Sequence, residues 1–299
     1  MNLENYKITP ELQQQIDNLI TKENTKEEVL NKITEILFNK IPFEKVKEEC
    51  QPLVHTFSCR CVTGPSNPFV YRCKTCQTSS TSCICVDCFK NGNHEGHEYY
   101  LQSLDGGGTC DCGTKSWNKE GWCKNHGKEF TGNAFELIPE QYKITFISVT
   151  KYLLEKLIEL FNKINKVFIE KKECDVLPNE AILVSYIVNV FNKLVDVDLF
   201  FIVLETIFSS VKGEYISIIS HKYKEITAMQ YLFECAFIES EIYKEDMNQL
   251  MLTMVTNEKT TDLCYGYFFD MLIEHGKRRL NKFYEKQKFA FSCQLFADD

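Results

Sequence analysis

Residues 59–126 are crowded with paired metal-ligand residues, and this feature constrains the fold more than any other. Ten of the fifteen cysteines lie between Cys59 and Cys123. A short gap lets one tight turn direct both members of a pair at a single ion, and four thiolate or imidazole ligands close a structural zinc site. The pattern predicts a multinuclear zinc module without an open position for catalysis. Its six pairs are Cys59/Cys61, Cys73/Cys76, Cys85/Cys88, His94/His97, Cys110/Cys112 and Cys123/His126.

The number of ligands indicates three zinc ions. The pairs from Cys73 to His126 supply ten ligands, and one cysteine of the first pair makes eleven. Three tetrahedral ions need twelve ligand positions, so eleven ligands suffice if one thiolate bridges two ions. If Cys59 and Cys61 both bind, no bridge is required. Cys83 is left over in either case and is expected to be a buried thiol.

Disulfides explain these cysteines less well than metal does. Disulfide scaffolds are usually small, secreted and preceded by a signal peptide, but the first residues of this chain lack an apolar segment. The longest apolar stretches, around 181–195 and 199–211, are interrupted by Asn and Glu and are too short to span a membrane. The sequence therefore predicts a cytoplasmic or nuclear protein without a membrane partner. A net charge of −8 argues against nucleic acid as a partner.

The composition divides the chain into three regions. Residues 55–130 are rich in Gly, Ser, Thr, Asn and Cys, and they cannot bury enough apolar surface to fold unaided, so metal binding must stabilise them. Residues 1–54 form a helical region, with start signals at Thr9-Pro10 and a capping box from Thr25 to Glu28. Residues 131–299 form an α-helical scaffold. The expected fold class is mostly α, with helical regions flanking a small, loop-rich zinc finger.

Apolar residues recur at helical spacing through most of the C-terminal region. A long helix is expected around residues 153–168, and Pro178 separates it from the next one. Residues 215–219 alternate like a strand, so their assignment to a helix is ambiguous. The further helical segments expected are 181–195, 199–211, 215–242, 247–255 and 263–283.

The order and spacing of the cysteines resemble the UBR box, the zinc finger with which N-recognin ubiquitin ligases bind N-degrons. The likeness covers roughly 70 residues and implies one ion held by four ligands, with two further ions sharing Cys88. The first ion would take Cys73, Cys76, His94 and His97. The other two would take Cys85, Cys88, Cys110, Cys112, Cys123 and His126 with one early cysteine, Cys61 in preference to Cys59. The likeness rests on Tyr71–Cys76, Cys85–Phe89, Gly92–Tyr99, Gly106–Gly113, Trp117 and Cys123–His126.

The resemblance implies that the module captures the N-terminal residue of a substrate protein for ubiquitin-dependent degradation. Asp111 suits an ammonium group, because a carboxylate forms strong charge-assisted hydrogen bonds and its neighbours Cys110 and Cys112 would be fixed by metal. Its alternative role is a solvated loop acid or a partner of a zinc ligand. Gly106, Gly107 and Gly108 leave space for a peptide backbone. The full expected substrate-binding set is Asp111, Thr81, Thr109, Thr114 and Ser79.

Two positions depart from the family pattern, because Ser79 and Thr114 stand where the family has aspartates. Neutral hydroxyls form weaker hydrogen bonds to cations than carboxylates do. Two expectations therefore stay open: the module recognises substrates with a small or uncharged first residue, or it has degenerate specificity for the first residue. Asp87 and Asp105 are candidates for compensation.

The chain is not expected to transfer ubiquitin by itself, since the isolated Cys and His residues outside the zinc finger offer no RING pattern. Its expected partners are N-terminal segments of substrates, together with a ubiquitin-conjugating enzyme or the rest of a ligase. Whether it is a fragment of a large ligase or a short relative stays open. The alternative function is a RING- or ZZ-like interaction module without N-degron selectivity.

Overall fold

The computed structural model describes residues 3–63, 67–104, 108–128, 130–171, 177–217, 219, 225–236, 240–254, 260, 263–267, 269–274 and 276–277. Most of these residues are helical, as predicted. The helices are η1 (Leu3–Asn5), α1 (Pro10–Leu19), α2 (Lys26–Leu37), α3 (Phe43–Cys50), α4 (Val86–Asn91), η2 (Lys119–Gly121), α5 (Ala134–Leu137), α6 (Glu140–Lys171), α7 (Pro178–Val195), α8 (Asp198–Ser210), α9 (Ala228–Cys235) and α10 (Lys244–Met254). The strands are β1 (Val62–Thr63), β2 (Phe69–Cys73), β3 (Ile84–Cys85), β4 (Tyr99–Ser103) and β5 (Gly108–Thr109).

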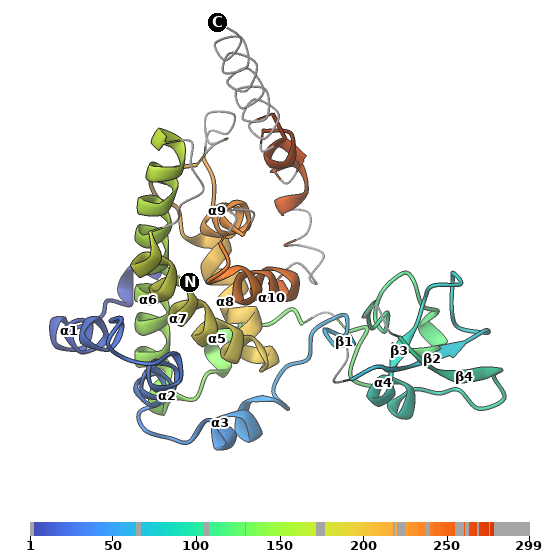
Figure 1. Cartoon of the computed structure of the whole chain (residues 1–299). Coiled ribbons are helices and arrows are strands. Elements are labelled where there is room, and N and C mark those ends of the chain that lie inside the picture. The colour runs from blue at the N-terminus through green and yellow to red at the C-terminus, as the bar shows by residue number, and fades with distance from the viewer. Residues whose placement is uncertain are drawn as a thin grey trace, which may run out of the picture.

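The helices before and after the zinc finger share one hydrophobic core, which Figure 1 shows as a single helical body. Phe38, at the end of α2, illustrates this packing. Its ring lies 5.2 Å from that of Tyr142, 5.7 Å from that of Phe146 and 5.3 Å from that of Phe200. Aromatic pairs at these separations stabilise a core more than the burial of their apolar surface alone would. The outer regions 1–54 and 131–299, separate in sequence, thus pack together in space. None of the described helices is both long and apolar enough to cross a bilayer.

The predicted helix starts in the N-terminal region are confirmed. Thr9 caps α1 by accepting a hydrogen bond from the N–H of Leu12, and Pro10 occupies the first turn. Thr25 and Glu28 form the reciprocal capping box of α2. Each cap satisfies N–H groups that have no partner within the helix.

The predicted helix over 215–242 is wrong for residues 215–217 and 225–227, which are not helical. Within the described part of that range, only α9 is helical, and residues 241–242 belong to a turn that leads into α10. Instead, the N–H of Ile216 donates to the side-chain oxygen of Asn162, and the carbonyl of Ile216 accepts from the side-chain amide of Asn165, at 2.9 Å each; both asparagines are on α6. Side chains of α6 thereby replace the hydrogen bonds that a local helix would supply. The spacing of apolar residues in the sequence does not show that side chains of α6 compete for these backbone hydrogen bonds.

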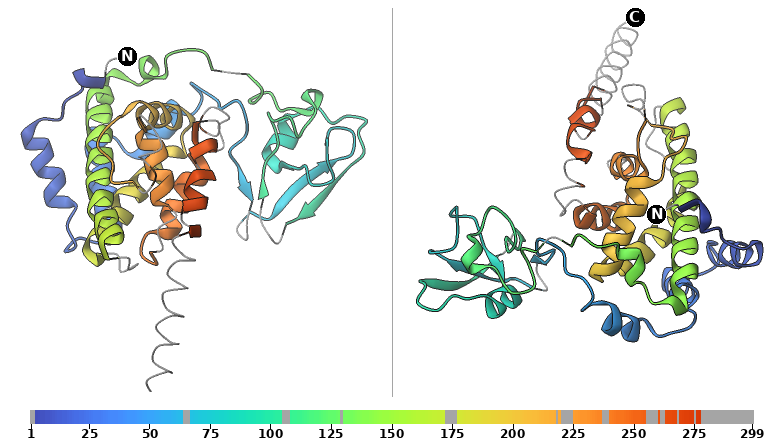
Figure 2. Two further views of the ribbon diagram at one scale, coloured as in Figure 1. Left: turned by 90° about the horizontal axis from the view of Figure 1, so that it is seen from above. Right: turned by 180° about the vertical axis from the view of Figure 1, so that it is seen from behind.

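The zinc finger contains two small antiparallel sheets and has its own buried cluster of cysteines around Trp117. In the larger sheet β2 lies between β3 and β4, and Tyr71 pairs with Ile84 on one side and Leu101 on the other. The smaller sheet pairs β1 with β5. In Figures 1 and 2 this module stands beside the helical body, entered by the chain after α3 and left by the chain before α5.

Arg60 anchors the zinc finger to the helical body. Its guanidinium forms an ion pair with Asp198 at the start of α8, donates to the carbonyl of Val195 at 2.5 Å and lies 4.2 Å from the ring of Phe201. The N–H of Thr56 also donates to Asp198 at 3.4 Å. Asp198 is buried, so its charge depends on these partners.

Replacing Arg60 with alanine should lower the free energy of unfolding by about 3 kcal/mol, because the buried carboxylate of Asp198 loses its counterion. Denaturant titration followed by circular dichroism would measure the change. The control is Lys212→Ala, which breaks an exposed ion pair with Glu225 and should cost no more than about 0.5 kcal/mol. Equal costs for the two variants would contradict the anchoring role of Arg60.

Candidate metal centre and peptide-binding site

The described residues bring eleven of the predicted ligand-type residues into three buried groups. Within each group the ligand atoms lie within 4.8 Å of one another. Two ligands of one tetrahedral zinc ion, a sulfur and a nitrogen, should lie about 3.6 Å apart. The Sγ of Cys73 lies 3.5 Å from the Nδ1 of His97, and that of Cys88 lies 3.4 Å from the Nδ1 of His126. The groups are Cys73/Cys76/His94/His97, Cys59/Cys85/Cys88/Cys110 and Cys88/Cys112/Cys123/His126.

An aromatic stack orients His94 in the first group. Tyr71 of β2 stacks on Phe89 of α4 at 3.7 Å, and Phe89 stacks on the imidazole of His94 at 4.4 Å with nearly parallel rings. The Nδ1 of His94 then lies 3.7 Å from the Sγ of Cys76. A ring held from its face cannot rotate away, so the ligand geometry is set before an ion arrives.

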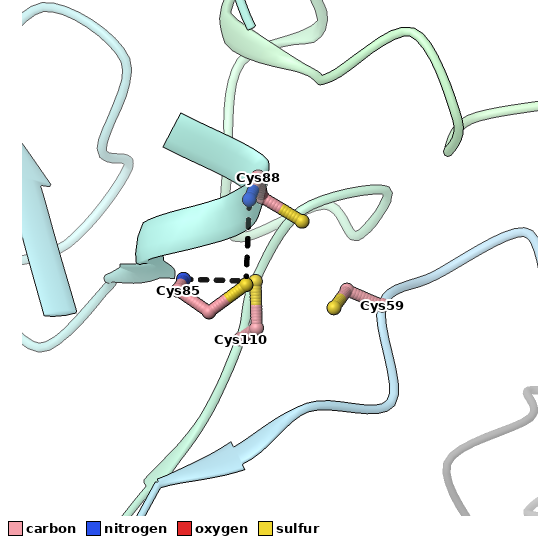
Figure 3. A group of neighbouring side chains, drawn as sticks. All are labelled: Cys59, Cys85, Cys88 and Cys110. Atoms are coloured by element: carbon pink, nitrogen blue, oxygen red, sulfur yellow. Dashed lines mark hydrogen bonds between the residues drawn. The ribbon is translucent and has the colours of Figure 1, made fainter. Parts of the chain in front are cut away.

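Backbone N–H groups compensate the charge that the second group would carry. The N–H of Cys85 donates to the Sγ of Cys110 at 3.2 Å, and the N–H of Cys88 donates to the Sγ of Cys85 at 3.4 Å (Figure 3). Such donors favour thiolates, the form in which cysteine binds metal. All four sulfurs come from different directions toward one centre, with Cys88 presented by α4. Every described cysteine is free of disulfide bonds, and the three groups are compatible with zinc.

The structure brings Cys59, rather than the preferred Cys61, into the second group. Residues 59–61 lie beside residues 110–112. The N–H of Cys59 donates to the carbonyl of Cys112 at 2.8 Å, and the N–H of Cys110 donates to the carbonyl of Cys61. The Sγ of Cys61 lies 3.8 Å from the amide of the exposed Asn67, and its thiol also shares a hydrogen bond with that of Cys85. The grouping therefore favours Cys59 as the early ligand, the alternative to Cys61 that the sequence left open.

Asp111 lies between two of these cysteines and is tied to a neighbouring loop by reciprocal hydrogen bonds. Its N–H donates to the carbonyl of Cys83, and its Oδ2 accepts from the N–H of Cys83, both at 2.8 Å. Burial raises the pKa of the Asp111 carboxyl, although the N–H of Cys83 and the charge of Arg72 act in the opposite direction. A half-buried carboxylate of this kind is stabilised by an added cation.

The four hydroxyl residues of the predicted binding set lie on the two loops that Asp111 joins. Ser79 and Thr81 share a hydrogen bond of 2.9 Å between their hydroxyls on the first loop, and both are exposed. Thr114 donates to the carbonyl of Asp111 at 2.9 Å, so its hydroxyl holds its own turn. Thr109 is exposed on β5. The candidates Asp105, Gly106 and Gly107 lie outside the described residues.

Two residues near Asp111 were missed by the sequence analysis. Arg72 of β2 donates from Nη1 to the carbonyls of Ser80 at 2.5 Å and Ser82 at 3.2 Å, and from Nε to Gln102. Cys83, expected to be a plain buried thiol, is buried, but its backbone also positions Asp111. Period-two alternation in β2 could have placed Arg72 on the face opposite Tyr71. Only the fold brings Arg72 to this loop.

Comparison with known proteins identifies the class of this module. Residues 57–126 match the family model of the zinc finger in N-recognin, the UBR box. This segment of the chain therefore matches the UBR box, as the spacing of its cysteines and histidines predicts. The match ends at His126, the last residue of the third ligand group.

The relatives that share this segment are E3 ubiquitin-protein ligases. PRT6 of Arabidopsis thaliana is 46% identical over 69 residues, covering 23% of this chain and 3% of the relative. Human UBR1 is 35% identical over 103 residues, covering 31% and 6%. Human UBR3 is 38% identical over 69 residues, covering 23% and 4%. The similarity thus spans only a few per cent of the length of these ligases.

Proposed function

We propose that residues 57–126 hold three zinc ions and bind the N-terminal residues of proteins that are to be degraded through ubiquitin. The observation that carries the proposal is the half-buried carboxylate of Asp111, fixed between Cys110 and Cys112 and tied to the loop at Cys83. Groups this rigid lose little entropy on binding, and a carboxylate in such a place favours an ammonium partner. Zinc would supply structure rather than chemistry, since each ion would have four protein ligands.

In this proposal the Cys88 thiolate bridges two ions, and Cys59 completes the set of eleven ligands. The substrate contacts would come from Asp111 with Ser79, Thr81, Thr109 and Thr114. Ubiquitin transfer would fall to a conjugating enzyme and a RING supplied by another segment or partner. The relatives named above support this setting, because each of them is an E3 ubiquitin-protein ligase.

The function predicts a requirement for a free α-amino group. Peptides identical except for N-acetylation should differ in affinity for the zinc-loaded chain by about tenfold or more, because acetylation removes a charge-assisted hydrogen bond worth about 1.5–3 kcal/mol. Isothermal titration calorimetry with the full 299-residue chain would measure both affinities. Equal affinity for the two forms would disprove recognition of protein N-termini.

One observation favours a second function, an interaction module without N-terminal selectivity. Phe69, Tyr99 and Leu101 are each about half exposed and lie on one face of the β2–β4 pair. Strand alternation places them together with Tyr71. Exposed apolar groups that gather in this way often mark a protein contact. A partner that binds this face would be indifferent to acetylation, so the same titration separates the two functions.

A further inference from the structure

Cys59 differs from the other three ligands of the second group in where the chain presents it. The other three come from within the zinc finger, whereas Cys59 lies near the point where the chain enters from the helical body. In Figure 3 it approaches the other sulfurs from its own segment of chain. On the zinc-finger side, the N–H of Cys59 donates to the carbonyl of Cys112 at 2.8 Å. The position of this ligand therefore depends on both parts of the protein.

Asp198, at the start of α8 in the helical body, holds the chain on both sides of Cys59. Its carboxylate pairs with the guanidinium of Arg60, the residue that directly follows Cys59, and accepts a hydrogen bond from the N–H of Thr56 at 3.4 Å. The hydroxyl of Thr56 in turn donates to the carbonyl of Ser58 at 2.7 Å. The short stretch that carries Cys59 is thus tied at both ends to one carboxylate.

The ion pair between Arg60 and Asp198 is well suited to fix the backbone beside it. The two side chains are only 10% and 12% exposed. The guanidinium also donates to the carbonyl of Val195 at 2.5 Å and lies 4.2 Å from the ring of Phe201. A planar guanidinium with several partners has one favourable orientation. Because neighbouring Cα atoms are about 3.8 Å apart, the backbone of Cys59 is held together with that of Arg60.

Metal affinity depends on the residues that hold the ligands as well as on the ligands themselves. Removing a partner that orients a ligand typically lowers the affinity for the metal by about 10- to 100-fold. A ligand that is held in place beforehand also loses less conformational entropy when the ion binds. The ties between Asp198 and the stretch around Cys59 meet this description.

We propose that Asp198 is a positioning residue for Cys59, through which the helical body strengthens the binding of zinc by the second ligand group. Asp198 lies outside residues 57–126, the segment that matches the family model, so this support comes from another part of the chain. The inference rests on the proposed function, because it concerns an ion which that function requires.

The test measures how readily each ligand group of the full-length chain loses zinc. Zinc-loaded protein is equilibrated with graded concentrations of EDTA and then treated with iodoacetamide, which alkylates cysteines once the metal has left. Mass spectrometry of peptides identifies the alkylated residues. In Asp198→Asn, Cys85 and Cys110 should become reactive at an EDTA concentration about tenfold lower than in the wild type. Cys73 and Cys76 should react at the same concentration in both proteins, because they belong to the first group.

Asp246→Asn is the matched control. The side chain of Asp246 is 17% exposed and pairs with Lys26 at 2.7 Å within the helical body. Its replacement should leave the reactivity of the second group unchanged. The same shift in Asp246→Asn, or an equal shift in the first group of Asp198→Asn, would show that the protein is loosened generally, and it would overturn the inference.

A double variant decides the question if Asp198→Asn alone does not fold, since that change leaves the charge of Arg60 buried without a counterion. Arg60→Met combined with Asp198→Asn removes both charges together, and circular dichroism would confirm that the helices persist. The double variant should show the same selective shift in the second group. An unchanged EDTA concentration in the folded variants would overturn the inference while the proposed function stands. A wild-type chain that binds no zinc would refute the proposed function, and the inference with it.

Discussion

If the chain holds three zinc ions as proposed, replacing Cys88 with serine should lower its zinc content to one ion. The Sγ of Cys88 belongs to both the second and the third ligand group, so its loss leaves two sites one ligand short. The group of Cys73, Cys76, His94 and His97 keeps all its ligands. Binding of a structural zinc ion contributes about 10 kcal/mol or more to such folds, and the affected half of the module should unfold without it. Native mass spectrometry would count the bound ions.

Two other variants make this experiment decisive. Cys73→Ser removes a ligand of one group only and should lower the count by one ion. Cys61→Ser removes a thiol from the same stretch that lies outside the three groups, and it should keep the full count. The helical body has a separate core and should stay folded in all three variants, as far-ultraviolet circular dichroism would record. If Cys88→Ser lost no more zinc than Cys73→Ser, the shared ligand would be refuted.

Replacing Asp111 with asparagine should weaken binding of free N-terminal peptides by about 2 kcal/mol, or roughly thirtyfold, because the ammonium group loses its counterion. The fold should survive, since the amide oxygen of asparagine can still accept the hydrogen bond from Cys83. Zinc content should also be unchanged. Calorimetry with a peptide bearing an uncharged first residue would measure the loss.

Glu120→Gln is the control for this prediction. Glu120 is an exposed carboxylate in η2 of the same module, and its replacement changes the net charge by the same amount. It should alter peptide affinity only slightly, because an exposed charge is well screened by solvent. Comparable losses in the two variants would show that net charge, rather than the position of Asp111, determines binding.

Local patterns predicted much of this protein correctly. The cysteine and histidine spacing indicated the zinc module and its UBR-box character, because ligand pairs must be close in sequence to meet at one ion. Thr9 and Thr25 indicated helix starts, because caps act within a few residues. These features depend on contacts between residues that are close in sequence, so the local sequence is enough to predict them.

Three features were settled only by tertiary structure. Hydrogen bonds from α6 kept Ile216 out of a helix, and the pairing of 59–61 with 110–112 brought Cys59 together with Cys85, Cys88 and Cys110. The fold also placed Arg72 beside the loop that holds Asp111. Each of these outcomes joins residues that are distant in the chain, so no local pattern contains it. The sequence alone determined that metal-ligand residues cluster here, and the tertiary structure decided which of them meet and which charges surround them.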